Sequence, residues 1–286
     1  MKSKIIIGCM SWGKGGKLLS TKEQSDLINF CVENGYNTFD HADIYGDYTT
    51  EAEFGRALKH SGVQRESIQL ITKCGIQNDG KNRNNRVKHY NYSKEYIVWS
   101  AEESLKNLGT DYLDTFLLHR PSPLMHPDEI AEAITQLKES GKIREFGVSN
   151  FTPSQMSLVS DKVKISVNQV EFSLTQPSAM EDGTFDYLLQ HGIGAMSWSP
   201  LGSVFKKEDK QTQRIKKVLA SLTDKYQTTE DVLLLAWILK HPVHISPVIG
   251  TTNRERIKNS SRPLELDLEL EDWFILLESS RGHKVA

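Results

Sequence analysis

The sequence predicts an α/β fold, a single (β/α)8 barrel of the TIM type, in which eight parallel strands alternate with covering helices. Eight short apolar segments of strand length occur along the 286 residues, and helical patterns separate most of them. Continuous apolar strands that alternate with helices are typical of a parallel sheet that is buried on both faces. Eight such units in a chain of this length favour a closed barrel over an open sheet.

The expected strands are short and rich in Ile, Leu, Val and Phe. Several follow a glycine that ends the preceding helical pattern, as Gly109 and Gly192 do, because glycine readily adopts the left-handed backbone of a helix end. The eight expected strands are residues 4–8, 36–40, 68–73, 112–119, 143–149, 165–170, 195–199 and 245–249.

The helices between them are predicted from apolar residues that recur every three or four positions. Two segments, residues 21–24 and 152–155, fit the capping box that begins a helix, and the second has Pro153 at the first helical position. The clearest periodic series are Ile97, Ala101, Leu105 and Leu108 in one expected helix, and Ile130, Ile134 and Leu137 in another.

No change in composition and no Pro/Ser-rich linker divides the chain, so residues 1–286 are expected to form one domain. The alternative fold is an open doubly wound sheet. It is disfavoured because residues 12–16 (WGKGG), after the first strand, lack the GxGxxG spacing of a dinucleotide-binding turn. Residues 75–92 and 201–210 are expected to be long loops, and such loops on a compact scaffold are often functional.

The composition argues against several classes of protein. The net charge is −2, so no overall field attracts nucleic acid, and the basic run at residues 81–88 is expected to be a solvated loop. No apolar run reaches the roughly eighteen residues of a membrane-spanning helix. Three scattered cysteines, Cys9, Cys31 and Cys74, predict a reducing compartment and hence a cytoplasmic protein.

Neither a metal site nor redox chemistry at a cysteine thiol is expected. His241 and His244 have a proline between them and no third ligand at a diagnostic spacing. Cys74 follows Lys73 directly, so on a strand its side chain should point away from that of Lys73 and pack in the core.

Four ionisable residues lie at or just beyond the ends of three consecutive expected strands. Asp40 ends the second strand and Tyr45 follows it, Lys73 ends the third, and His119 ends the fourth. The active site of a βα barrel lies at the carboxyl ends of its strands. These four side chains are therefore expected to converge at the mouth of the barrel.

The chain resembles the aldo-keto reductase family at five or more motifs, which occur in the family's order and cover nearly the whole sequence. The motifs are residues 39–46 (FDHADIYG), 71–73 (ITK), 111–121 (DYLDTFLLHRP), 147–151 (GVSNF), 168–171 (NQVE), 198–202 (WSPLG) and 250–259 (GTTNRERIKN). The resemblance implies an NAD(P)H-dependent oxidoreductase that reduces a carbonyl group, with Asp40, Tyr45, Lys73 and His119 as its catalytic residues.

This resemblance assigns a role to each of the four residues. Hydride attack on a carbonyl leaves an alkoxide, and Tyr45 would supply the proton as general acid. A nearby Lys73 would lower the pKa of that tyrosine by favouring the phenolate, and Asp40 would hold the lysine. His119 would orient the carbonyl oxygen with a hydrogen bond. The alternative for Tyr45 is an ordinary loop aromatic, and for Asp40 and Lys73 a buried ion pair.

The resemblance also implies the cofactor site. Ser149, Asn150 and Gln169 would bind the nicotinamide carboxamide, and Trp198, followed by Ser199 and Leu201, would stack on the ring. At the adenosine end, Arg256 would pair with a 2′-phosphate, which favours NADP(H) over NAD(H). Many relatives have a lysine where this chain has Gly250, so NAD(H) remains possible and Arg254 is a further candidate. The remaining residues assigned to the adenosine end are Thr251, Thr252 and Asn259.

The substrate is expected to be a small carbonyl compound. Met10 and Trp12 would form an apolar wall, Tyr48 would also line the pocket, and Arg120 and His41 leave room for a polar or acidic group. Residues 75–92 and the tail from residue 264 would complete it. The protein is expected to be a monomer. The alternative function is a cofactor-binding sensor or regulatory subunit on the same barrel, which the intact set of four residues disfavours.

Overall fold

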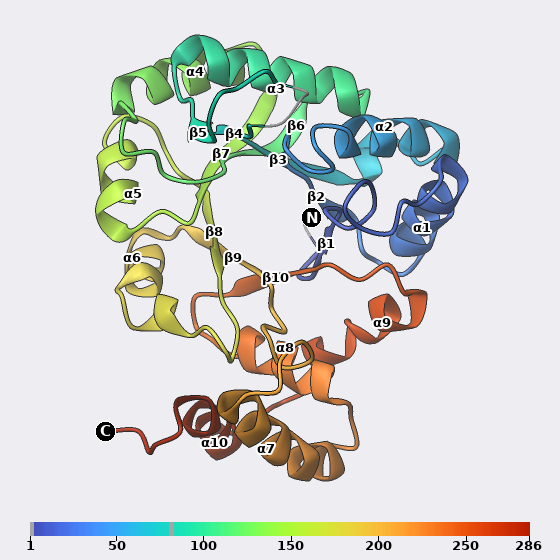
Figure 1. Cartoon of the computed structure of the whole chain (residues 1–286), viewed down its shortest axis with the longest axis vertical. Coiled ribbons are helices and arrows are strands. Elements are labelled where there is room, and N and C mark those ends of the chain that lie inside the picture. The colour runs from blue at the N-terminus through green and yellow to red at the C-terminus, as the bar shows by residue number, and fades with distance from the viewer. Residues whose placement is uncertain (1–2, 80–82) are drawn as a thin grey trace.

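The computed structural model describes residues 3–79 and 83–286, and its centre is a closed barrel of eight parallel strands (Figure 1). Each barrel strand pairs with the barrel strands before and after it in the sequence, and β1 pairs with β10 to close the ring. The barrel strands are β1 (Ile6–Gly8), β2 (Thr38–Asp40), β3 (Gln69–Cys74), β6 (Leu113–Leu118), β7 (Ile143–Ser149), β8 (Val167–Glu171), β9 (Gly194–Trp198) and β10 (Ile245–Ile249).

Helices connect these strands and surround the barrel, as Figure 1 shows. They are α1 (Thr21–Glu33), α2 (Thr50–Ser61), α3 (Lys94–Leu108), α4 (Pro127–Glu139), α5 (Pro153–Ser160), α6 (Thr184–His191), α7 (Lys210–Tyr226), α8 (Glu230–Leu239), α9 (Arg254–Asn259) and α10 (Leu270–Arg281). Single turns of 3-10 helix occupy Arg65–Ser67, Ser178–Met180 and Arg262–Leu264.

The predicted fold and all eight predicted strands are confirmed. The predicted ranges 143–149 and 245–249 match β7 and β10 from end to end, and the other six differ from the observed strands by one or two residues at their ends. The expected long loop at residues 75–92 contains a short antiparallel pair, β4 (Ile76–Gln77) and β5 (His89–Tyr90). Residues 80–82 of that loop lie outside the described residues, and two of them, 81 and 82, begin the basic run.

One of the two predicted capping boxes begins one residue earlier than expected. Helix α1 is capped by Ser20, whose side chain accepts from the backbone N–H of Glu23, while the Glu23 carboxylate accepts from the backbone of Ser20. Thr21 therefore lies inside the helix. The second box is confirmed, with Thr152 and Gln155 capping α5 reciprocally and Pro153 in its first turn.

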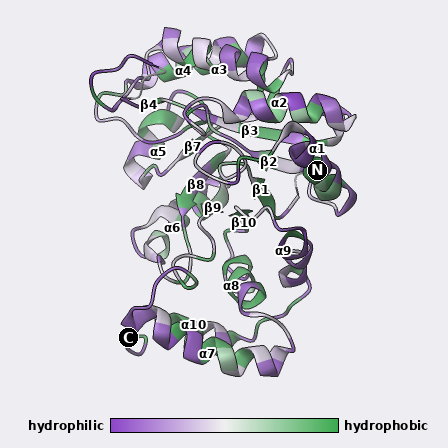
Figure 2. Ribbon diagram, turned by 45° about the vertical axis from the view of Figure 1, so that its right-hand side comes forward, coloured by the Kyte–Doolittle hydropathy of each residue, from purple (hydrophilic) through white to green (hydrophobic). Residues whose placement is uncertain are grey.

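The apolar core has two layers. Inside the barrel, a small cluster comprises Ile6, Ile71, Leu117, Val167, Met196 and Val248. A larger cluster fills the space between the strands and the helices, and Figure 2 shows the strands mostly in the hydrophobic colour. The predicted helical series belong to this outer layer, since Ile97, Ala101, Ile130 and Ile134 are fully buried.

The tail from residue 264 was expected to complete the substrate pocket. It does not lie over the barrel mouth but folds outside the barrel. Helix α10 packs against α7 and lies beyond α8 at the bottom of Figure 1. The rings of Trp237 and Trp273 stack with centroids 5.1 Å apart, and each indole N–H donates to the backbone oxygen of the other residue. This reciprocal pair fixes α10 to α8.

Two expectations from composition can be compared with the described residues. Cys9, Cys31 and Cys74 are all buried free thiols, and Cys74 belongs to the outer core, on the side of β3 away from the barrel interior, as predicted. Within residues 3–79 and 83–286, no helix is both long and apolar enough to span a membrane.

Candidate active site

A buried lysine, Lys73, contacts two of the other predicted catalytic side chains, Asp40 and Tyr45, near the ends of β2 and β3. The ammonium nitrogen Nζ of Lys73 lies 2.8 and 2.7 Å from the two carboxylate oxygens of Asp40. It also donates to the backbone oxygen of His41 at 2.7 Å and lies 3.4 Å from the phenolic oxygen of Tyr45. Lys73 is fully buried and Asp40 is 3% exposed. The three donors of the ammonium are thus all directed at oxygen atoms.

The electrostatics of this group keep the lysine charged. Burial alone lowers the pKa of Lys73, but Asp40 and Tyr45 raise it, and the pKa lies above its ordinary value. For Tyr45, burial raises the pKa more than Lys73 lowers it, so the net pKa is raised. The sequence had suggested that Lys73 lowers this pKa, and it does so, but burial of the phenol outweighs the effect of the cation.

His119 lies across from Tyr45, and the two rings meet edge to face with centroids 6.0 Å apart. Burial and the charges of Lys73 and Arg120 hold the pKa of His119 well below its ordinary value, so the ring is neutral. Its buried Nδ1 has no hydrogen-bond partner in the described part of the chain. The tautomer with the proton on Nε2 therefore leaves no buried N–H unsatisfied.

Next to this group, three residues form a polar network: Ser149 at the end of β7, Asn150 directly after it, and Gln169 of β8. The Gln169 amide nitrogen donates to Oδ1 of Asp40 at 3.0 Å, and the Ser149 hydroxyl donates to the backbone oxygen of Gln169 at 2.8 Å. The Asn150 amide nitrogen donates to the Ser149 hydroxyl at 2.8 Å. The structure thus places these three predicted cofactor residues together and beside Asp40.

Trp198 at the end of β9 joins this network through its indole nitrogen, which donates to Oδ1 of Asn150 at 3.0 Å. Asn150 and Ser199 both have a left-handed backbone, with φ of 61° and 51°. Such angles in residues other than glycine cost roughly 1–3 kcal/mol each and are concentrated at functional sites. Leu201 follows in a half-buried turn.

The residues assigned to the adenosine end lie after β10 and in α9. Gly250 is exposed, and its backbone oxygen accepts from the Ser11 hydroxyl at 2.9 Å. Arg254 and Arg256 are both exposed, and the Arg254 guanidinium lies over the Phe30 ring, 5.4 Å from its centroid. This contact joins α9 to α1. Thr251, Thr252 and Asn259 are half-buried.

The candidate substrate residues do not all meet at the site. Met10 is 62% exposed, and the Arg120 guanidinium lies over the Trp198 ring, 5.4 Å from its centroid. Trp12, however, is fully buried against Phe39 and Phe54, because its indole fills the outer core. His41 is also fully buried, so neither Trp12 nor His41 forms a wall of an open pocket, as the sequence had suggested.

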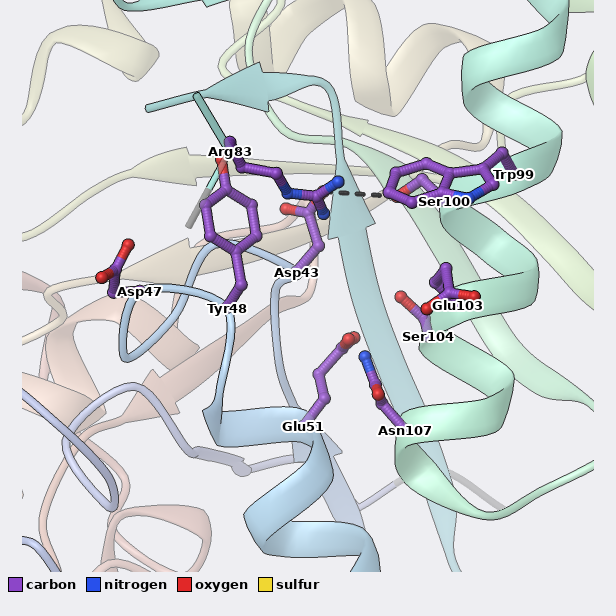
Figure 3. Close-up of a pocket in the computed structure, with 10 residues that line it drawn as sticks. All are labelled: Asp43, Asp47, Tyr48, Glu51, Arg83, Trp99, Ser100, Glu103, Ser104 and Asn107. Atoms are coloured by element: carbon purple, nitrogen blue, oxygen red, sulfur yellow. Dashed lines mark hydrogen bonds between the residues drawn. The ribbon is translucent and has the colours of Figure 1, made fainter. Parts of the chain in front are cut away.

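Tyr48 lines a separate polar cavity of about 370 Å³ between α2, α3 and the loop after β2 (Figure 3). The Arg83 guanidinium lies 4.3 Å from the centroid of Tyr48 and 4.6 Å from that of Trp99. Below it, Asp43 is 6% exposed, and burial and Glu51 raise its pKa to about 8. The sequence had not singled out Asp43, although it lies within the motif at residues 39–46.

Across the described residues, no group of three or more His, Cys, Asp or Glu side chains is arranged to hold a metal ion. His241, the first histidine of the pair noted in the sequence, packs instead against the aromatic rings of Phe172 and Phe185.

The sequence model of the Aldo/keto reductase family matches residues 4–279 of this chain. The chain belongs to the aldo/keto reductase family. This aldo/keto reductase is 41% identical over 289 residues to the "Uncharacterized oxidoreductase YcsN" of Bacillus subtilis, which covers 99% of this chain and 96% of that protein. It is 36% identical to a 6-dehydroglucose reductase of Agrobacterium fabrum, with 99% and 96% covered.

Solved structures agree on the fold. The thermostable aldo-keto reductase Tm1743, in complex with the inhibitor epalrestat, has a TM-score of 0.83 over 97% of this chain and 95% of that chain, at 23% identity. Family membership together with the relatives makes this aldo/keto reductase an oxidoreductase that acts on carbonyl groups, and the family generally uses nicotinamide cofactors.

Proposed function

We propose that this aldo/keto reductase reduces small aldehydes or ketones with NADPH and that Tyr45 is its general acid. The observation that carries the proposal is the contact of the buried Asp40–Lys73 pair with the phenol of Tyr45, 3.4 Å from the lysine nitrogen, opposite the neutral ring of His119. One site thereby supplies an acid, a charged partner for that acid and a hydrogen-bond donor for the carbonyl oxygen.

The polar network fits a nicotinamide carboxamide, which has one acceptor oxygen and one NH2 donor group. Because Gln169 directs its amide nitrogen to Asp40, its amide oxygen remains to accept. Asn150 accepts from Trp198 through Oδ1 and donates one amide N–H to the Ser149 hydroxyl at 2.8 Å. A carboxamide oxygen would therefore take the other N–H, whose nitrogen lies 3.5 Å from the backbone oxygen of His119. The two amides thus offer a donor and an acceptor of the kinds that a carboxamide requires, and the half-buried Trp198 offers an aromatic face for the ring.

When bound, NADPH supplies a hydride to the carbonyl carbon. Tyr45 donates its phenolic proton to the carbonyl oxygen as negative charge develops there. The raised pKa of Tyr45 keeps that proton in place at neutral pH until it is needed. Lys73, held by Asp40, then stabilises the phenolate that remains, and His119 orients the carbonyl oxygen through a hydrogen bond from Nε2.

Preference for NADPH over NADH rests on Arg256. A guanidinium can pair with both oxygens of a phosphate, and the Arg256 side chain is exposed on α9. Gly250 offers no charge at the preceding turn. We therefore expect NADPH to bind more tightly than NADH, with NADH still bound.

The substrate proposal follows from the site and from one relative. The Agrobacterium relative is named as a reductase of 6-dehydroglucose, which is a polar carbonyl compound. Arg120 and His119 supply polar contacts at the mouth, while Met10 supplies an apolar one. We propose a small polar carbonyl substrate, and a single-domain monomer in the cytoplasm, where the three buried free thiols would remain reduced.

The experiment is a titration of the purified protein with NADPH and with NADH, followed by tryptophan fluorescence, and then a screen of aldehydes and ketones by loss of NADPH absorbance. Micromolar NADPH binding with carbonyl-dependent oxidation supports the reductase. Tight binding without turnover on any carbonyl tested would favour a cofactor sensor, and failure to bind either cofactor would refute the proposal.

A further inference from the structure

We propose that Tyr92 is a positioning residue for His119, and that it acts through the backbone of Arg120. This inference rests on the catalytic role of His119 proposed above. Tyr92 lies between β5 and α3, outside the motifs that relate the chain to its family, and its ring is 5% exposed.

The Tyr92 hydroxyl contacts both backbone groups of the residue that follows His119. Its oxygen lies 2.5 Å from the backbone oxygen of Arg120 and 3.1 Å from the backbone nitrogen of Arg120. It also lies 3.4 Å from the backbone oxygen of Cys74. Because a phenol has one proton, the short contact identifies Arg120 oxygen as the acceptor, while the hydroxyl oxygen accepts from the Arg120 N–H. Burial holds the pKa of Tyr92 well above its ordinary value, so the proton is retained.

These contacts extend the pairing of the two strands that carry catalytic residues. β3 and β6 pair in parallel up to Cys74 and Leu118, and the His119 N–H still donates to the Cys74 oxygen at 2.9 Å. At the next residue, Arg120, the backbone N–H and oxygen form hydrogen bonds with the Tyr92 hydroxyl instead of with a neighbouring strand. The end of β6 is thereby held next to the end of β3, which carries Lys73.

Gly75 makes this arrangement possible. Its φ is 112°, and a Cβ atom there would lie 1.9 Å from a ring carbon of Tyr92. A side chain at residue 75 would therefore push the ring away from the strand ends. Asn91, the residue before Tyr92, also donates its backbone N–H to the Gly75 oxygen at 2.9 Å, so two neighbouring residues fix the loop to the end of β3.

His119 needs such support because its own ring is weakly held. Its buried Nδ1 has no hydrogen-bond partner among the described residues, and its contact with Tyr45 is an edge-to-face one between rings 6.0 Å apart. The direction of its Nε2 therefore depends on the backbone that carries it. A loose end of β6 would misdirect the hydrogen bond to the carbonyl oxygen.

The test is Tyr92→Phe, which removes the hydroxyl and keeps the ring, beside Tyr112→Phe as the matched control. Tyr112 precedes the other end of β6, at the opposite face of the barrel. Amide hydrogen exchange should be at least tenfold faster at Arg120 in Tyr92→Phe and unchanged in the control, because Arg120 N–H loses its acceptor. This readout needs neither cofactor nor substrate.

Kinetics then test the link to His119. In Tyr92→Phe, kcat at saturating NADPH should fall about tenfold, while the NADPH Kd should change less than twofold. The isotope effect on kcat, measured with NADPH deuterated at C4, should rise. Gly75→Ala should shift kcat in the same direction. Unchanged exchange at Arg120, or faster exchange with unchanged kcat, would overturn the inference. Absence of turnover in the unmodified protein would instead refute the proposed function.

Discussion

The indole nitrogen of Trp198 donates a hydrogen bond to Oδ1 of Asn150 at 3.0 Å, across the ends of β9 and β7. The bond decides which way the Asn150 amide faces, and both flanking backbones, at Asn150 and Ser199, are left-handed. Trp198 therefore has two roles in the proposed cofactor site. Its ring face stacks on the nicotinamide, and its N–H orients the Asn150 amide, which forms a hydrogen bond with the carboxamide.

Trp198→Phe should separate these roles, since phenylalanine keeps an aromatic face but has no donor. We expect the NADPH Kd to rise about tenfold, which corresponds to about 1.4 kcal/mol and is typical of one lost hydrogen bond. Calorimetry should be used, because the variant lacks the fluorescent reporter. Trp99→Phe, far from this network, is the control. Equal affinities for the Trp198 variant and the unmodified protein would show that the indole N–H does not orient the site.

Arg256→Ala should weaken NADPH binding by about tenfold or more and leave NADH binding within about twofold, because only NADPH carries the 2′-phosphate that a guanidinium can pair with. Arg254→Ala is the comparison, since the Arg254 guanidinium lies over Phe30. Competition titrations with both cofactors measure the four affinities. An equal loss for NADPH and NADH in Arg256→Ala would remove Arg256 from phosphate recognition.

Lys73→Met should lower the free energy of unfolding by about 3–5 kcal/mol, because it leaves the buried carboxylate of Asp40 without its cation. Lys142→Met, which removes a surface ion pair with Glu102, should cost less than about 1 kcal/mol. Urea denaturation at pH 7 compares the two. Similar losses of unfolding free energy in the two variants would mean that the Asp40–Lys73 pair is as well solvated as a surface ion pair.

The barrel could be predicted from sequence because its signals are local. Apolar runs and helix-ending glycines report on a few neighbouring residues, and all eight strands were found within two residues of their ends. The side chains of Asp40, Tyr45, Lys73 and His119 could be predicted to lie near one another because strand ends converge in any barrel. The capping box at Ser20 was displaced by one residue, since Ser20–Glu23 and Thr21–Gln24 both satisfy the same local pattern.

Features that depend on contacts between distant residues could not be predicted. Trp12 was expected in the pocket, but its burial depends on Phe39 and Phe54, which lie far along the chain. The pKa of Tyr45 depends on how deeply the phenol is buried, which a motif does not state. The bond from Trp198 to Asn150 joins residues 48 positions apart.

The buried carboxyl group of Asp43 should affect how stability depends on pH. Its pKa is raised to about 8 in the folded protein from 3.8 when exposed, so the folded state holds a proton that the unfolded state has lost. Its contribution to stability is present below pH 3.8 and is lost as the pH rises to 8. Asp43→Asn should remove this loss.

The stability of Asp43→Asn relative to the unmodified protein should therefore rise by about 1.4 kcal/mol per pH unit, or roughly 4 kcal/mol between pH 5 and pH 8. Urea denaturation of both proteins across that range measures the difference, and the contributions of His41 and His119 cancel in it. A difference that stays constant with pH would mean that Asp43 is ionised in the folded protein at pH 5.

The most direct test of the account is the turnover of Tyr45→Phe, measured with a carbonyl substrate found in the screen, together with its NADPH affinity. The phenol is the proposed proton donor, so its loss should lower kcat by about 10²–10⁴-fold, the range of general acid catalysis. The NADPH Kd should remain within about twofold, since the proposed cofactor contacts lie on other residues. Turnover equal to that of the unmodified protein would contradict the assignment of Tyr45 as general acid.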